Sequence, residues 1–245
     1  MYQVLGGLPL APSRCNIREN GHHLMAHVKL DTILARAGEA ATRSGRRPED
    51  VVVVAVGKTF PAEVLLEIYE AGHRDFGENR AQELSAKADL LPDDIRWHFV
   101  GPLQRNKVRL VRPAVALLHS MDRLALGDAW LKGPGMPPPV LLEINIGEEP
   151  QKAGVAPHLA EEVIGQLIER GVDVRGLMAI PPRVDSPEDA RRYFGRMADL
   201  REALQPGYPQ IRELSMGMTE DFEIAIEEGA TLVRVGRAIF GPRIR

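Results

Sequence analysis

The chain has 245 residues, which is enough for one large barrel or two small domains. Its net charge of −3 argues against a general electrostatic attraction to nucleic acid or to an anionic lipid surface. No apolar run reaches the length of a membrane span, and the single cysteine, Cys15, excludes an intrachain disulfide and a cysteine-based metal cluster. The composition therefore indicates a cytoplasmic globular protein with neither a nucleic-acid nor a membrane partner.

The first 27 residues differ in composition from the rest of the chain. They contain scattered Gly, Pro and Asn without a period, together with His22, His23 and His27. The histidines would suit a metal site, but a loose chain end explains this composition more simply. We expect residues 1–27 to be a poorly ordered leader and residues 28–245 to form the folded unit.

From residue 28 onward, helical and strand patterns alternate. An amphipathic helix over 28–44 ends at Ser44-Gly45, and the β-branched run 51–56 then has the pattern of a parallel strand buried on both faces. Pro61 opens the next helix, at a position where its missing N–H costs nothing. Further strands are predicted at 73–77, 96–101, 115–120, 140–146, 174–180, 213–216 and 231–235, and further helices at 61–71, 81–90, 105–111, 123–131, 157–170, 187–204 and 219–228.

This alternation of strands and helices implies a parallel sheet with helices outside it. Eight units in about 200 residues fit a closed (β/α)₈ barrel of the TIM type better than the alternative, an open doubly wound sheet. No linker-like stretch divides the chain. We expect one barrel with an extra N-terminal helix and no second domain.

Lys58 stands at the end of the first predicted strand, where a barrel of this type carries its reactive groups. Alternation along the strand puts Val54, Val56 and Lys58 on one face. If that face is the lumen, the amine tends to lose its proton and to become a nucleophile toward carbonyl groups. A lysine that reaches the rim and pairs with a glutamate would fit the same position.

A second feature is the segment 215–219, Ser-Met-Gly-Met-Thr, which joins a short strand to a helix. Thr219 is expected at the N-cap, where backbone N–H groups favour an anion, usually phosphate. The loops after strands seven and eight are a common phosphate site in these barrels. Gly236 adds a second glycine turn at the next strand end, although glycines also simply close helices.

Arg234 lies two residues before Gly236, on a last strand that would neighbour the first one. On the luminal face its charge would favour a neutral Lys58, and on the outer face it would pair with a helix carboxylate. An amine nucleophile, a phosphate cradle and a buried arginine together match the aldehyde, phosphate and ring nitrogen of pyridoxal phosphate. A class I aldolase acting on a sugar phosphate, which would use only the first two, is the main rival.

Several stretches now carry a resemblance to the pyridoxal phosphate homeostasis proteins, which are relatives of the barrel domain of alanine racemase. They extend from the first strand to the C-terminus, so the resemblance covers nearly the whole chain. They are Val-Ala-Val-Gly-Lys-Thr-Phe-Pro at 54–61, Phe-Gly-Glu-Asn-Arg-Ala-Gln-Glu at 76–83, Trp-His-Phe-Val-Gly-Pro-Leu-Gln-Arg-Asn-Lys at 97–107, Gly-Leu-Met-Ala-Ile-Pro at 176–181, Leu-Ser-Met-Gly-Met-Thr at 214–219, and Val-Arg-Val-Gly at 233–236 with Ile-Phe-Gly-Pro-Arg at 239–243.

The resemblance implies pyridoxal 5'-phosphate as the cofactor and assigns it a set of binding residues. Lys58 would form the Schiff base, Arg234 would face the pyridine nitrogen, and Asn79 and Met216 would line the ring. The residues implied for the phosphate are Ser215, Gly217, Thr219 and Gly236. Gly57 is a small departure, since the family is expected to have serine there more often.

The implied function is that of a monomeric carrier that holds pyridoxal phosphate for intracellular homeostasis and hands it to pyridoxal-phosphate-dependent apo-enzymes. An arginine opposite the ring nitrogen leaves that nitrogen unprotonated, so the ring is a weaker electron sink. We also expect neither the second domain nor the tyrosine base of alanine racemase. A racemase or another one-base amino acid enzyme remains the alternative, so we assign no catalytic residue.

Other polar residues receive a structural interpretation first. His98 and His119 would suit acid–base chemistry but are more often satisfied core histidines. Lys107 and Lys152 would suit assistance in cofactor release, although solvated lysines are commoner. No metal constellation is expected.

Overall fold

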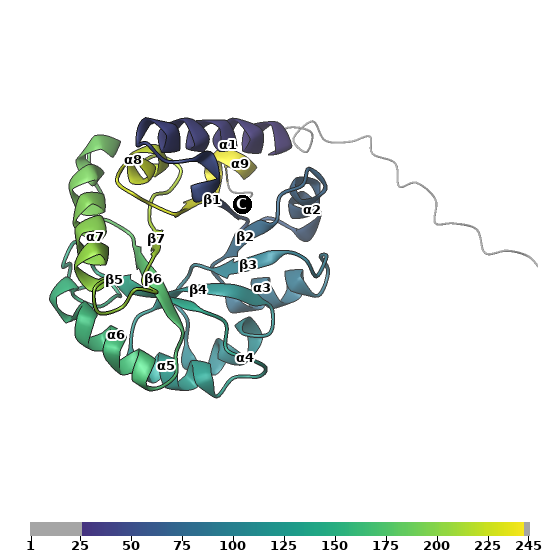
Figure 1. Ribbon diagram of the computed structural model, residues 1–245. Coiled ribbons are helices and arrows are strands. Elements are labelled where there is room, and N and C mark those ends of the chain that lie inside the picture. The colour runs from purple at the N-terminus through teal and green to yellow at the C-terminus, as the bar shows by residue number, and fades with distance from the viewer. Residues whose placement is uncertain (1–25, 243–245) are drawn as a thin grey trace, which may run out of the picture.

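The structure, a computed structural model, describes residues 26–242 (Figure 1). Within these residues eight parallel strands follow one another around a closed barrel, because β8 pairs with β1 as well as with β7. The strands are β1 (Val52–Val56), β2 (Asp75–Glu78), β3 (Arg96–Phe99), β4 (Val115–Met121), β5 (Val140–Ile144), β6 (Val174–Ala179), β7 (Glu213–Ser215) and β8 (Leu232–Val235). The prediction of a barrel rather than an open sheet is confirmed.

Helices surround the barrel, as the alternating pattern predicts. They are α1 (Ala26–Arg43), α2 (Ala62–Glu70), α3 (Ala81–Ala88), α4 (Val108–Val111), α5 (Leu124–Leu131), α6 (Ala160–Glu169), α7 (Arg191–Leu204), α8 (Phe222–Glu227) and α9 (Arg237–Phe240). Short 3₁₀ turns stand before β1 (η2, Pro48–Asp50), α4 (η3, Arg105–Lys107), α6 (η4, Pro157–Leu159) and α7 (η5, Pro187–Ala190). No helix in this part of the chain is long and apolar enough to cross a membrane.

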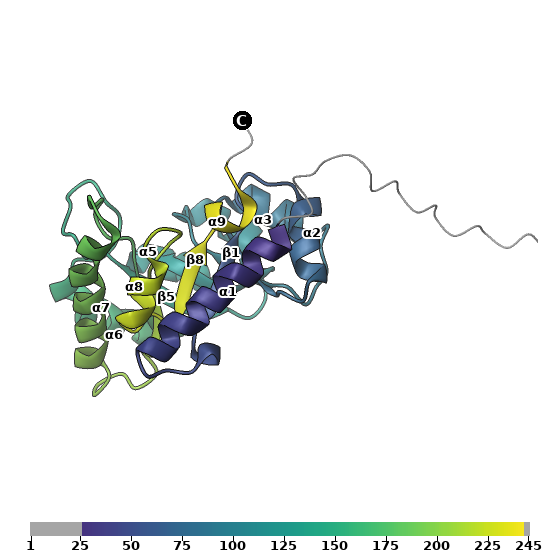
Figure 2. The same cartoon turned by 90° about the horizontal axis from the view of Figure 1, so that it is seen from above.

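The extra N-terminal helix, α1, covers the outside of the barrel beside α8 and α9 (Figure 2). Its buried face includes Leu30 and Ile33. Arg36 reaches Glu223 on α8 with a 2.6 Å ion pair, and Arg43 reaches Glu227 at 2.9 Å. The helix begins at Ala26, two residues before the predicted boundary, and the predicted leader otherwise lies outside the described residues.

Side chains on the strands alternate between the lumen and the outer layer against the helices. A small apolar cluster fills the lumen, and it contains Val54, Val56, Leu117, Leu141, Met178 and Leu232. The remaining apolar strand residues belong to the much larger cluster under the helices. Polar residues on the luminal faces of the strands therefore gather inside the barrel, and they define the candidate site.

Candidate functional site

Lys58 lies in the turn that directly follows β1 and is half-buried there. Val54 and Val56, the residues four and two positions earlier, share one face as predicted, and that face, which the sequence left open, is the lumen. The next residue, Thr59, has a φ of 70°, which is unusual for a β-branched residue. Such strain persists only where the surroundings fix the backbone, and here the Thr59 N–H donates to Glu83 Oε2 at 3.0 Å.

A buried ion pair between Lys87 and Glu78 contacts the backbone of the same turn. Lys87 on α3 donates to the Gly57 carbonyl at 3.0 Å and contacts the carboxylate of Glu78, at the end of β2. The side chain of Glu78 is fully buried and that of Lys87 is 8% exposed. Burial raises the pKa of Glu78, and the bond and charge of Lys87 act in the opposite direction. The sequence analysis missed this pair, because its members lie nine residues apart on different elements.

Arg234 lies on β8 and is buried in the barrel, which confirms the luminal alternative. Its Nη1 donates to Ser215 Oγ at 2.5 Å, and its Nη2 donates to the Ala179 carbonyl at 2.9 Å. Burial lowers the pKa of Arg234 to about 10, against the opposing charges of Glu143 and Asp221, so the group stays cationic at neutral pH. Because Val54 is the register partner of Arg234, β1 and the luminal guanidinium are neighbours.

Two predicted cofactor ligands next to this site, Ser215 and Met216, lie on opposite faces of the sheet. The Ser215 hydroxyl lies inside the barrel between Arg234 and His119, whose Nδ1 is 2.7 Å away, and its role toward the phosphate stays a prediction. The side chain of Met216 is fully buried in the layer under the helices, so it does not line the lumen. The reason is the two-residue period, because a luminal Ser215 turns Met216 outward.

The two glycine turns after β7 and β8 do come together. The Arg234 N–H donates to the Gly217 carbonyl at 3.0 Å, and an added Cβ on Gly236 would lie 3.0 Å from the Val56 carbonyl of β1. Gly217 has a φ of 86°, which favours glycine. Thr219 is not the N-cap, however, because α8 begins at Phe222 with Asp221 before it, and Thr219 lies half-buried in the preceding turn.

Asn79 follows β2 at the same end of the barrel. Its Oδ1 is buried and has no hydrogen-bond partner among the residues that the structure describes. A buried polar atom normally has a partner, so an unpaired one at a strand end suggests a missing ligand. This is the placement expected for a residue next to a bound ring.

Glu143 on β5 is a titratable luminal residue that the sequence analysis did not select. It borders a cavity of about 170 Å³ that also involves Asn145, Lys152 and Ile180. Burial raises the pKa of Glu143 to about 7, with help from the charge of Asp122 and opposition from Arg234. The only sequence signal was a carboxylate in an otherwise apolar strand. Lys152 is half-buried, and its Nζ reaches Glu149 at 2.5 Å and the Pro181 carbonyl at 3.1 Å.

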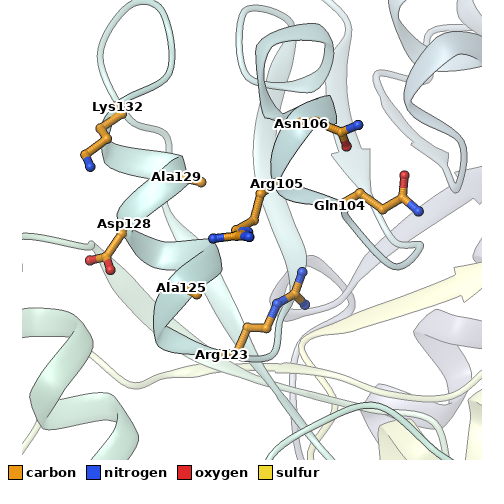
Figure 3. Close-up of a pocket in the computed structure, with 8 residues that line it drawn as sticks. All are labelled: Gln104, Arg105, Asn106, Arg123, Ala125, Asp128, Ala129 and Lys132. Atoms are coloured by element: carbon orange, nitrogen blue, oxygen red, sulfur yellow. The ribbon is translucent and has the colours of Figure 1, made fainter.

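A larger groove of about 720 Å³ lies away from these residues, between η3 and α5 (Figure 3). Arg105 and Arg123 project into it, and Asp128 on α5 and Lys132, the residue after α5, flank it. None of the predicted cofactor residues borders it. Lys107 is the last residue of the neighbouring η3, in the connection between β3 and α4.

His98 and His119 are both buried and bond to each other at 2.9 Å, which favours the interpretation as satisfied core histidines. Among residues 26–242 there is no group of three or more His, Cys, Asp or Glu side chains that could hold a metal ion.

The fold and the luminal arginine beside a lysine-bearing strand define a barrel of the alanine racemase N-terminal domain class, and the model of that family matches residues 28–243. The pyridoxal phosphate homeostasis protein of Aquifex aeolicus is 43% identical over 221 residues, which covers 88% of this chain and 97% of that protein. The chain belongs to the family of pyridoxal phosphate homeostasis proteins.

Solved structures agree with this assignment. A structure described as an unknown protein from Bifidobacterium adolescentis is 31% identical, with a TM-score of 0.85 over 92% of this chain and 98% of that chain. PipY of Synechococcus elongatus, solved with pyridoxal phosphate bound, is 36% identical, with a TM-score of 0.71 over 85% of this chain and all of that chain.

Proposed function

We propose that this protein binds pyridoxal phosphate reversibly through Lys58 and takes part in intracellular pyridoxal phosphate homeostasis. The observation that carries the proposal is the pairing of β1 with β8, which places the strand that leads to Lys58 beside the strand that carries the buried luminal Arg234. The names of the relatives and the bound cofactor of PipY support the same conclusion.

The residues at the barrel mouth fit the proposed cofactor. Asn79 offers a buried oxygen without a partner, and Arg234 keeps three of its five N–H donors beyond the two bonds described above. The joined turns at Gly217 and Gly236 suit the phosphate, with Thr219 in the first of them. Ser215 stays a predicted member of the phosphate set, and its hydroxyl also accepts from Arg234.

The cofactor supplies an aldehyde that condenses reversibly with an amine and releases water. In this chain Lys58 provides the amine, and hydrolysis of the link returns both partners, as a carrier requires. Arg234 donates and does not accept hydrogen bonds, so it leaves a facing ring nitrogen unprotonated. A weakly electron-withdrawing ring suits storage and transfer better than carbanion chemistry.

A one-base amino acid enzyme is the second candidate, and Glu143 is the observation that favours it. A luminal carboxyl with a pKa of about 7 is suited to proton transfer near neutral pH. Incubation with an amino acid in deuterated water tests this candidate, because steady exchange at the α-carbon that is lost in Glu143→Gln would support it. An aldolase has no support from the family assignment.

The proposal extends to a monomer in the cytoplasm that supplies pyridoxal-phosphate-dependent apo-enzymes. The support is compositional: one cysteine in 245 residues suits a reducing compartment.

An absorbance spectrum tests the site. Wild type, Lys58→Ala and the control Lys132→Ala are each mixed with pyridoxal phosphate, and the imine band is recorded beside a far-UV circular dichroism spectrum. Lys132 is exposed at the groove that none of the predicted cofactor residues borders, so its variant is expected to keep the band. Lys58→Ala is expected to lose the band and keep the fold. A band that persists in Lys58→Ala would overturn the assignment of the lysine.

A further inference from the structure

A linear series of side-chain hydrogen bonds crosses the lumen, with Arg234 at one end. Arg234 is bonded to Ser215 Oγ at 2.5 Å, and Ser215 Oγ is 2.7 Å from His119 Nδ1. His119 Nε2 is 2.9 Å from His98 Nδ1, and His98 Nε2 is 3.2 Å from Asp75 Oδ1. We call these five residues the luminal chain.

The luminal chain spans the barrel rather than following its wall. Arg234 and Ser215 are on the neighbouring strands β8 and β7, whereas His119 is on β4, across the lumen. The remaining two members, His98 and Asp75, lie on β3 and β2. All five residues are buried, so each polar atom depends on its neighbour for a bond that water does not replace.

The chemistry of the two ends allows one direction in which each imidazole has one donor and one acceptor nitrogen. An arginine only donates, so Ser215 Oγ accepts from Arg234, and in this direction its hydroxyl proton points to His119 Nδ1. His119 then carries its proton on Nε2 and donates it to His98 Nδ1. His98 in turn donates from Nε2 to the carboxylate of Asp75, which only accepts. Every link then has one donor and one acceptor.

Asp75, at the end of the luminal chain opposite Arg234, is held as a carboxylate, and His119, in the middle, is held as a neutral imidazole. Burial opposes ionisation of Asp75, but the hydrogen bonds from His98 and from Arg96, whose Nε is 2.8 Å away, hold the pKa of Asp75 below its usual range. Burial is the main reason that the pKa of His119 lies well below its ordinary value, and the charge of Arg234 acts in the same direction. A carboxylate that accepts at Asp75 and an uncharged His119 are both required by this direction of donation.

We propose that His98 and His119 are positioning residues, which act through Ser215 to fix the orientation of the Arg234 guanidinium toward the cofactor ring. This inference rests on the proposed function, because it concerns the ring that Arg234 would face. The Ala179 carbonyl holds only one side of the guanidinium. Without the acceptor nitrogen of His119, the hydroxyl hydrogen of Ser215 would be free to point toward Arg234. It would then oppose the N–H group that Arg234 donates to Ser215 Oγ.

The chain itself is tested without the cofactor, by ¹⁵N NMR of the histidine rings in the full-length protein. In both His119 and His98 the ring proton is expected on Nε2 and not on Nδ1, with signals assigned from the single variants. A proton on Nδ1 of either ring would overturn the direction of the luminal chain.

The link to the cofactor is tested with two substitutions of His119. His119→Leu fills the space but removes both ring nitrogens, and it is expected to weaken pyridoxal phosphate binding about tenfold or more. The pH midpoint of the imine band should move in the same variant. His119→Gln keeps one acceptor and one donor, so it should recover part of both effects. None of these variants alters Glu143 or Asp221, the two charged groups that act on Arg234.

Leu117→Ala is the matched control, because Leu117 lies on the luminal face of the same strand but outside the luminal chain. It is expected to lower stability and leave the pH midpoint in place. If His119→Leu does not fold, Ser215→Ala, which removes one oxygen atom, should shift the midpoint in the same direction. Wild-type affinity and midpoint in these variants would overturn the inference, whereas a wild type without the band would instead refute the proposed function.

Discussion

Removal of Lys87 should expose how strongly the turn at Lys58 depends on a buried ion pair. The substitution Lys87→Met keeps much of the side-chain volume and deletes the ammonium group. It leaves the fully buried carboxylate of Glu78 without its partner, and the Gly57 carbonyl without the donor 3.0 Å away.

The size of the effect follows from that burial. Breaking a buried ion pair by removal of one partner costs about 3–5 kcal/mol, because the other charge stays desolvated and uncompensated. We expect a loss of this size in the free energy of unfolding of Lys87→Met, a large part of the stability of an ordinary domain. The double variant Glu78→Gln/Lys87→Met should recover much of it, since no buried charge remains. Lys132→Met, at an exposed lysine, should change it by less than about 0.5 kcal/mol.

Urea unfolding at two pH values is the assay. Without Lys87 the pKa of Glu78 in the folded state rises further above its unfolded value, so protonation favours the folded variant. The deficit of Lys87→Met should therefore be small near the unfolded pKa, about pH 4.5, and should grow as the pH rises through the folded pKa. A deficit below about 1 kcal/mol at about pH 8, or one that the double variant does not reduce, would refute the reasoning.

Two further predictions concern the barrel mouth. Gly217→Ala should lower the free energy of unfolding by about 1–3 kcal/mol, because the new Cβ would lie 2.5 Å from Ala225 Cβ at a φ of 86°. Gly38→Ala on α1, where the atom nearest to the new Cβ is 3.4 Å away, should raise the free energy of unfolding by up to about 1 kcal/mol. If urea unfolding gave the same change for both variants, the argument from the turn geometry at Gly217 would be wrong. Glu143 should titrate at about pH 7 in ¹³C NMR of its carboxyl carbon. The folded pKa of Glu143 is raised from 4.5, so its contribution to stability is complete below pH 4.5 and is lost as the pH rises through about 7. In Glu143→Gln the free energy of unfolding should therefore depend less on pH over this interval. Titration of Glu143 at the pKa of an ordinary glutamate would contradict the argument from burial.

The sequence by itself determined the architecture, because period and burial are local properties of each strand. The run before Lys58 was apolar on both faces, and the alternating units predicted a closed barrel that the structure confirms. The position of Lys58 beside β8 follows from closure of the ring, and so does the luminal placement of Arg234, which the sequence left open. Element ends were less certain, since α8 begins at Phe222 and not at 219.

Only the tertiary structure decided which partners the buried polar groups have. Alternation tells which face a side chain occupies, but it carries no information on the residue that lies across the lumen. The bond between His119 and Ser215 joins residues 96 positions apart, and the same Ser215 hydroxyl accepts from Arg234. The same holds for Lys87 under the Lys58 turn and for the raised pKa of Glu143, because desolvation and distant charges depend on how the closed barrel packs.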